Sequence, residues 1–195
     1  KLFNSAAVIN NKRIIGVYNK ICLPNYGVFD EKRYFSPGDD ICVFKSRFFS
    51  FGICICEDIW HINGPANLLL RSGIDLLITI NASPFYAGKW KERKNIISNL
   101  NNNKTVFAYL NIVGGQDEIV FDGHSFVSDK TGKIICRGKQ FNEDIIFFDC
   151  NGNGKFKKFK SIKVVNFEIT RSKHKPSIIN KPEKPFSKVK EIYNA

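Results

Sequence analysis

Residues 48–60 constrain the fold more than any other part of the chain. They begin with the run Phe-Phe-Ser-Phe-Gly-Ile-Cys-Ile (48–55), and Cys56 and two acidic residues follow it. Such a run of apolar, aromatic and β-branched residues predicts a buried strand in the core of a sheet. A few residues after Cys56, an Asn-Gly pair followed by Pro65 predicts a turn and a helix that begins near Pro65. The sequence therefore places Cys56 at the end of a buried strand, before a turn and a helix.

A cysteine in this position has two interpretations. A thiol on the rigid end of a strand can point into a crevice and act as a nucleophile. Alternatively, Cys56 is a small buried hydrophobic residue, as most free cysteines are. The local pattern leaves both interpretations open.

Strands and helices alternate along the rest of the chain, which predicts an α/β sandwich with helices covering sheets. We expect a domain over residues 1–150 and, over 151–195, a basic edge segment (155–163) and a linker or tail (173–190). The predicted strands are 5–9, 13–18, 40–45, 47–55, 74–80, 105–110, 125–128, 133–137 and 145–148, and the predicted helices are 66–72 and 89–102.

Composition excludes several classes of protein. A hydrophobic content of 43% argues against disorder, and 195 residues suit one domain with a sizeable core. The six cysteines form neither a dense disulfide framework nor a zinc-type spacing, so we expect no metal site and a reducing, cytoplasmic location. There is no apolar run long enough for a membrane span and no secretory signal. Because the sequence contains no methionine, we expect a fragment of a longer protein.

Four segments of this sequence are similar to one known family. The resemblance is to the glutaminase domains of glutamine-dependent NAD⁺ synthetases, which are members of the nitrilase superfamily, and it extends over about residues 2–149. It implies a nitrilase-like α-β-β-α sandwich, incomplete at the N-terminus. The matching segments are KICLPNYGVFDEKRYF (20–35), GICICEDIW (52–60), NASPF (81–85) and NIVGGQDEIVFDG (111–123).

The resemblance implies a Cys–Lys–Glu mechanism. Cys56 would attack the side-chain amide of glutamine, form a γ-glutamyl thioester and release ammonia. The ammonium of Lys20 would favour the thiolate and, with the backbone N–H of Glu57, would stabilise the oxyanion. Glu31 would orient Lys20 and the attacking water. Without the resemblance, Lys20 is a solvated surface lysine and Glu31 belongs to an ion-paired loop.

Four residues match substrate-binding positions of the family, namely Tyr26, Glu57, Ser83 and Lys89. A hydroxyl or an ammonium group there can bind the α-amino and α-carboxylate groups of glutamine. The alternatives are core packing for Tyr26, a turn residue for Ser83 and a solvated charge for Lys89. Residues 111–122 form either a pocket wall or a contact with another domain.

The sequence also departs from the family pattern. The general-base glutamate of the family precedes the lysine, but no glutamate lies before Lys20. The ATP-binding S-G-G-x-D-S signature is absent too, although residues 191–195 resemble the start of a synthetase domain. We therefore expect an isolated chain with little activity and no cofactor of its own. In the complete enzyme its ammonia would serve the ATP- and Mg²⁺-dependent amidation of deamido-NAD⁺ in a synthetase domain of the same chain, within a homo-oligomer.

Three other functions remain as alternatives. The first is a nitrilase-type amidase that acts on another amide. The second is a catalytically dead scaffold, which has no need to keep Cys56, Lys20 and Glu31. The third is a nucleic-acid binder, because the formal net charge is +12 and two phenylalanines lie among the lysines of 155–163. The charge is spread along the chain, however, and no nucleic-acid motif is present, so we expect neither a nucleic-acid nor a membrane partner.

Overall fold

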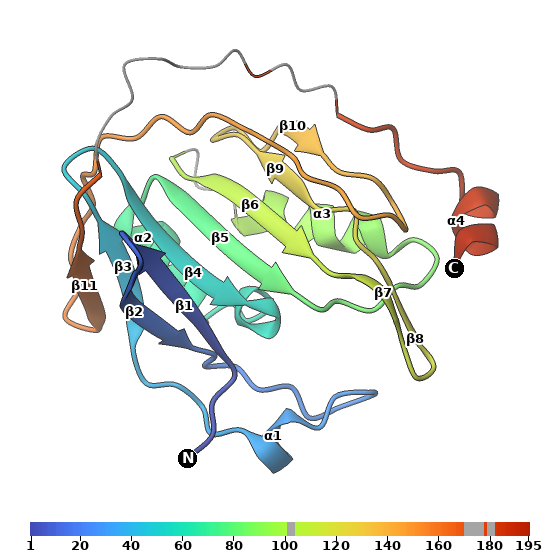
Figure 1. The fold of residues 1–195 in the computed structure, drawn as a ribbon, viewed down its shortest axis with the longest axis horizontal. Coiled ribbons are helices and arrows are strands. Elements are labelled where there is room, and N and C mark those ends of the chain that lie inside the picture. Colours follow the sequence, from blue (N-terminus) through green and yellow to red (C-terminus); the bar gives the residue numbers. More distant parts are fainter. Residues whose placement is uncertain (101–103, 170–177, 179–181) are drawn as a thin grey trace.

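A mixed sheet of seven strands lies at the centre of the structure, a computed structural model that describes residues 1–100, 104–169, 178 and 182–195 (Figure 1). In spatial order the strands are β10 (Ile134–Arg137), β9 (Phe126–Ser128), β6 (Val106–Asn111), β5 (Leu76–Asn81), β4 (Ser50–Ile55), β3 (Ile41–Lys45) and β11 (Ile162–Asn166). The three central strands β4, β5 and β6 run parallel. Their carboxyl ends therefore meet at one edge of the sheet, where Ile55 pairs with Ile80 and Asn81 with Asn111.

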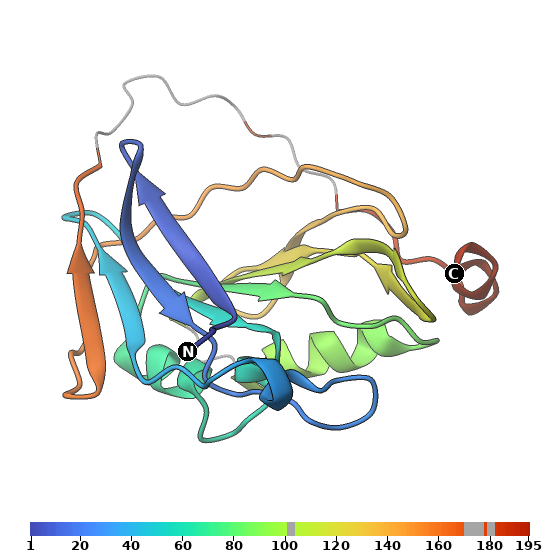
Figure 2. The same ribbon diagram turned by 60° about the horizontal axis from the view of Figure 1, so that its bottom comes forward.

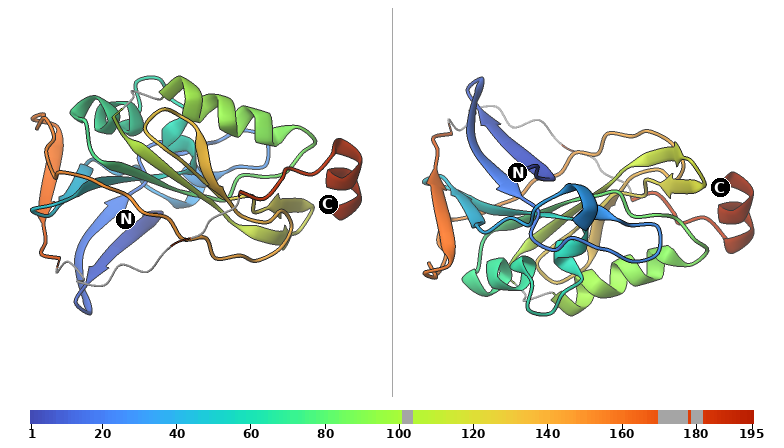
Figure 3. Two further views of the ribbon diagram at one scale, coloured as in Figure 1. Left: turned by 90° about the horizontal axis from the view of Figure 1, so that it is seen from above. Right: turned by 90° about the horizontal axis from the view of Figure 1, so that it is seen from below.

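Two helices cover one face of this sheet. Helix α2 (Pro65–Ser72) begins at a proline and ends at Gly73, whose φ of 76° is the left-handed conformation that a helix C-cap favours. Helix α3 (Lys89–Leu100) lies beside it, and Figures 2 and 3 show both helices on the same side. Between helices and sheet lies an apolar core that includes Leu69, Ile97 and Phe107. The helices form because each one buries an apolar face against the sheet.

A hairpin covers part of the opposite face of the sheet (Figure 3). Strands β1 (Ser5–Asn10) and β2 (Arg13–Asn19) pair antiparallel, and Asn11 and Lys12 both have positive φ between them. Tyr18 of this hairpin is buried in a second core that also contains Phe44 and Ile53. With helices on one face and a hairpin on the other, the layered α/β architecture that the sequence predicts is confirmed.

The segment after β10 returns across the sheet to its far edge. It runs from β10 to β11, which pairs parallel with β3 (Figure 1). The buried carboxylate of Asp75 fixes its path by accepting hydrogen bonds from the backbone N–H groups of Asn153 and Gly154, at 3.2 and 3.1 Å. The chain passes so close there that a Cβ on Gly152 would lie 2.5 Å from Cγ of Asp75. The last helix, α4 (Lys188–Asn194), lies at the other end of the molecule.

Several local expectations fail. No strand forms over 145–148. The basic segment 155–163, expected as an edge strand or a surface segment, enters the edge strand β11 (Ile162–Asn166) only at its last two residues. The sequence analysis missed the short helix α1 (Glu31–Tyr34), the hairpin of β7 (Val113–Gln116) with β8 (Ile119–Asp122), and helix α4. Residues 173–177 and 179–181 of the expected tail at 173–190, and the expected end of α3 at 102, lie outside the described residues. Where the tail is described, 182–187 is irregular and 188–190 belongs to α4.

None of the helices in the described residues combines the length and the apolar character that crossing a bilayer requires.

Candidate active site

Cys56 lies where strand β4 ends and a 3₁₀ helix, η1 (Cys56–Ile59), begins. Its φ is +43°, in the left-handed region that residues with a Cβ rarely occupy. Such a conformation costs roughly 1–3 kcal/mol and persists only where the surrounding structure enforces it. As a residue, Cys56 is half-buried. The expected position at the end of a buried strand is confirmed, and the strained backbone conformation marks the point where the chain leaves the strand.

Lys20 and Glu31 form a buried ion pair near this cysteine. The Nζ of Lys20 lies 2.6 Å from Oε1 of Glu31, and only 1% of Lys20 is exposed. Lys20 follows β2, and its backbone is hydrogen-bonded to Asn4 and Gly38. Glu31 is the first residue of α1, and its buried Oε2 has no hydrogen-bond partner within the described residues. Such burial excludes the interpretation of Lys20 as a solvated surface lysine.

Opposing effects act on the thiol of Cys56. Burial raises the pKa of this thiol, and the charge of Lys20 lowers it. A hydrogen bond from the backbone N–H of Ala82, just after β5, also lowers the pKa, whereas the negative charges of Glu57 and Glu31 raise it. Burial is the largest effect, so the pKa of the Cys56 thiol lies above its ordinary value; Lys20 and the N–H of Ala82 reduce that rise and are the groups that stabilise the thiolate.

Glu57 links two side chains at the entrance to this region. The carboxylate accepts a 2.8 Å hydrogen bond from the hydroxyl of Tyr26, and Nε2 of His61 lies 3.3 Å from its other oxygen. Burial, together with the hydrogen bond to Glu57 and the charge of Glu57, raises the pKa of Tyr26 to about 12. Tyr26 itself is 59% exposed, which excludes core packing as its role. Glu57 is buried, so its charge is available only to groups that enter the site.

Ser83 is fixed by an arginine that the sequence analysis did not single out. Arg93 of α3 is fully buried and donates to the carbonyl of Ser83 at 2.7 Å and to its hydroxyl at 3.3 Å. The same guanidinium binds both carboxylate oxygens of Asp122 at 2.7 and 3.0 Å. The side chain of Asn111 accepts a hydrogen bond from the backbone N–H of Ser83. The segment that places Ala82 beside the thiol is thus held by side chains from two other elements, and Asp122 holds one of them, Arg93, in place.

Lys89 contacts the turn that contains Cys56. Its ammonium lies 4.6 Å from the ring centre of Trp60, the residue that ends η1, and 3.1 Å from the carboxylate of Glu92. Only 15% of its side chain is exposed. These contacts argue against the interpretation of Lys89 as a solvated charge at the start of a helix.

A family model for carbon-nitrogen hydrolases matches residues 1–153. The chain belongs to the carbon-nitrogen hydrolase family.

Relatives of this hydrolase domain agree with that assignment. The chain is 48% identical over 149 residues to the glutamine-dependent NAD⁺ synthetase of Thermotoga maritima, a match that covers 75% of this chain and 26% of the relative. It is 44% identical to a glutamine-dependent NAD⁺ synthetase from Acinetobacter baumannii whose structure was solved with adenosine diphosphate; the TM-score is 0.67, and the match covers 73% of this chain and 27% of that one. A carbon-nitrogen hydrolase from Helicobacter pylori G27 is 26% identical with a TM-score of 0.64, over 72% and 54% of the two chains.

These comparisons confirm the nitrilase-like fold and the family resemblance of the hydrolase domain. The chain spans about a quarter of the length of the two synthetases. The roles of Cys56, Lys20, Glu31, Tyr26, Glu57, Ser83 and Lys89, and the division at residue 150, stay predictions.

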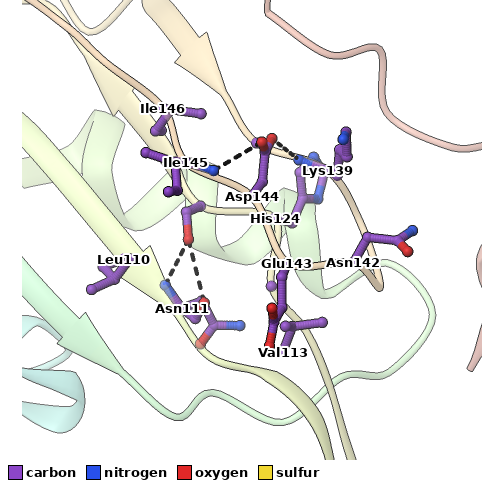
Figure 4. A pocket seen from close by; sticks show the side chains of 13 residues that line it. Leu110, Asn111, Val113, His124, Lys139, Asn142, Glu143, Asp144, Ile145 and Ile146 are labelled. Carbon is purple, nitrogen blue, oxygen red and sulfur yellow. Dashed lines mark hydrogen bonds between the residues drawn. The ribbon is translucent and has the colours of Figure 1, made fainter.

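A cavity of about 820 Å³ lies elsewhere in the hydrolase domain; none of the predicted catalytic and substrate-binding residues lines it, but Asn111 and Val113 of the segment 111–122 do (Figure 4). Asp144 accepts hydrogen bonds from the backbone N–H groups of Lys139 and Ile145 at its border. The pKa of His124, which also lines the cavity, is lowered to about 3 by burial and by the charges of Arg137 and Arg93. This histidine is therefore neutral near pH 7. Across the described part of the chain, no three His, Cys, Asp or Glu side chains are grouped as metal ligands.

Proposed function

We propose that this domain hydrolyses the side-chain amide of glutamine, with Cys56 as the nucleophile. The observation that supports this most directly is the ion pair of buried Lys20 with Glu31, whose cation opposes the rise that burial gives to the pKa of a thiol on a strained turn. Burying the ammonium group of a lysine costs free energy. Stabilisation of a thiolate on Cys56 would explain why a charged lysine is buried here. The relatives named glutamine-dependent NAD⁺ synthetase favour glutamine over other amides.

The chemistry has two steps. The sulfur of Cys56 attacks the amide carbon, and the oxyanion that forms is stabilised by the ammonium of Lys20 and by the backbone N–H of Glu57. The C–N bond then breaks, the nitrogen takes up a proton, and ammonia leaves a γ-glutamyl thioester. Water attacks the thioester while Glu31 orients it, the C–S bond breaks, and glutamate and the free thiol are released.

Charge assigns the substrate contacts. The carboxylate of Glu57, with the hydroxyl of Tyr26 bound to it, suits the α-ammonium group of glutamine. The ammonium of Lys89, near the same turn, suits the α-carboxylate. Ser83 contributes through a hydroxyl that Arg93 already orients. Opposite charges on the two sides of the site would select an amino acid over an aliphatic amide.

In the full-length protein we place this reaction upstream of an ATP-dependent amidation. The ammonia would convert deamido-NAD⁺ to NAD⁺ in a synthetase domain that binds ATP and Mg²⁺, within a homo-oligomer in the cytoplasm. For this chain alone we expect slow glutamate release or none, because its sequence has no glutamate before Lys20 to accept the thiol proton.

A covalent probe tests the proposal on this chain without requiring turnover. A diazo-ketone analogue of glutamine should alkylate Cys56, and mass spectrometry of the digested protein should locate the label. Glutamine in excess should protect Cys56, whereas acetamide and propionamide should not. The matched control is Cys22→Ala, which removes a partly buried thiol that also lies near Lys20 and should leave labelling intact.

Three results would contradict the proposal in different ways. Labelling that survives in Cys56→Ala would show that another thiol reacts. Protection by aliphatic amides but not by glutamine would identify an amidase for another substrate. No labelling of Cys56 in the folded protein would favour the catalytically dead scaffold.

A further inference from the structure

The carboxylate of Asp58 is fully buried and accepts four hydrogen bonds from the chain around it. One oxygen accepts from the backbone N–H groups of Ile21 and Cys22, at 3.2 and 2.8 Å. The other accepts from the hydroxyl of Tyr18 at 2.7 Å and from the backbone N–H of Ile55 at 2.9 Å. Every donor is neutral, so a charged acceptor is satisfied here by hydrogen bonds alone.

The donors belong to the two segments that the proposed chemistry requires to meet. Tyr18, Ile21 and Cys22 surround Lys20 in the sequence, whereas Ile55 immediately precedes Cys56. Asp58 itself is the third residue of η1, two positions after Cys56. A single carboxylate thus joins the chain on both sides of the lysine to the chain on both sides of the cysteine.

Among the strands of the described residues, no sheet pairing makes this connection. Lys20 follows β2, which belongs to a separate two-stranded sheet, and Cys56 follows β4 in the central sheet. The backbone hydrogen bonds of Lys20 lead to Asn4 and Gly38, on the hairpin side of the molecule. The distance between the ammonium and the sulfur therefore depends on the contacts that Asp58 makes, on the hydrogen bond between Tyr26 and Glu57, and on apolar packing.

We propose that Asp58 is a positioning residue that sets the distance between Nζ of Lys20 and Sγ of Cys56. It touches neither substrate nor the reacting atoms, and its effect is exerted through the lysine. The inference rests on the proposed function, because it assumes that Lys20 activates Cys56.

The direction in which the pKa of the Cys56 thiol changes when Asp58 is replaced distinguishes a positioning role from a direct effect of the Asp58 charge. Lys20, Glu31, Glu57 and the N–H of Ala82 are the groups that act on the thiol of Cys56. Removing the negative charge of Asp58 can only make a nearby thiol easier to ionise. If the same substitution also moves Lys20 away, however, Cys56 loses its cation and becomes harder to ionise. The two explanations predict opposite shifts.

The experiment is alkylation of the folded chain with iodoacetamide across a pH series, resolved by mass spectrometry for each cysteine. Asp58→Asn should raise the pH midpoint for Cys56 by about one unit. Cys22 provides an internal control of opposite sign, because burial and the charge of Asp58 raise its pKa to about 12. Its midpoint should fall in the same variant.

Asp75→Asn is the matched control for a structural defect. Asp75 is also buried and also accepts four hydrogen bonds, but from Ser50, Asn153 and Gly154 at the other end of β4. The Asp75→Asn substitution should lower the unfolding midpoint of the protein without changing the pH midpoint for alkylation of Cys56. Tyr18→Phe deletes one donor only and keeps the test possible if Asp58→Asn does not fold. We expect a smaller rise in the midpoint for this variant.

The outcomes separate this inference from the proposed function. A midpoint for Cys56 that stays or falls in Asp58→Asn, and stays in Tyr18→Phe, overturns the positioning role. If Lys20→Gln raises the midpoint while both of those variants leave it unchanged, the lysine matters and only the role of Asp58 is wrong. If Lys20→Gln has no effect either, the proposed activation of Cys56 is itself wrong.

Discussion

Strand β4 has a buried aspartate at each end, and the two are a natural comparison. Asp75 binds Ser50, the first residue of the strand, and Asp58 binds Ile55, the last. Both carboxylates accept four hydrogen bonds and both tie a remote segment to the sheet. Around Asp75 that segment is the Asn-Gly-Asn-Gly loop of 151–154, whereas around Asp58 it contains Lys20. The same local chemistry thus serves folding at one end and, by our proposal, catalysis at the other.

The largest effect that the comparison predicts is on stability, and it is the same for both residues. Asp58→Ala and Asp75→Ala each leave several buried donors without an acceptor, and each such donor costs roughly 1–3 kcal/mol. We expect each variant to lose about 3 kcal/mol or more of unfolding free energy. Urea unfolding followed by circular dichroism measures this loss. A cost well under about 1 kcal/mol at either site would show that water replaces the carboxylate there.

The next effect distinguishes the two ends. Lys20→Met removes the cation near Cys56, so the thiolate population near neutral pH should fall about tenfold for each unit by which the thiol pKa rises. Labelling of Cys56 by the diazo-ketone analogue should slow accordingly. Lys163→Met is the control, because Lys163 forms an exposed ion pair with Asp40 on the edge of the sheet. Equal slowing in both lysine variants would assign the effect to net charge rather than to position.

A third effect, on the pH dependence of stability, concerns the buried His124. The pKa of this buried imidazole falls to about 3 in the folded state, mainly because of burial, whereas an unfolded histidine titrates near 6.5. The unfolded chain therefore binds an extra proton between those values, and stability should decline as the pH falls from about 6.5 to about 3. Unfolding of His124→Gln, measured in parallel, should show a shallower decline. An identical pH dependence in the two proteins would exclude this histidine as the cause.

Much of the sheet could be predicted because its signals are local. The apolar runs of β4, β5 and β6 exceed what a half-exposed strand shows, and Pro65 and Gly73 mark the ends of α2. The run at 145–148 carries the same signal yet forms no strand. It alternates between exposed Ile145 and Phe147 and the partly buried residues between and after them, so its inner side packs against the core although it forms no strand. The hydrophobic pattern of a segment reveals which of its sides is apolar, but it does not reveal whether a neighbouring strand is available for pairing.

The candidate site divides in the same way. Cys56 could be placed because a strand ends before it, and the family resemblance supplied Lys20 and Glu31. Asp58 escaped notice because three of its four donors lie 36 to 40 residues away in sequence, and no local pattern encodes such a pairing. Arg93 had a weak signal, since it lies on α3 between Trp90 and Ile97 at helical spacing. A charge on an apolar helix face points to a buried partner, which here is Asp122.

The left-handed backbone at Cys56 bears on which inactive variant is useful for capturing a bound substrate. Alanine or serine keeps a Cβ and so retains the torsional cost of the native turn, and with it the arrangement of the surrounding groups. Glycine adopts a φ of +43° without penalty and would relax the chain at this point. The glycine variant would be the more stable protein, whereas the alanine variant would keep the backbone conformation of the active site.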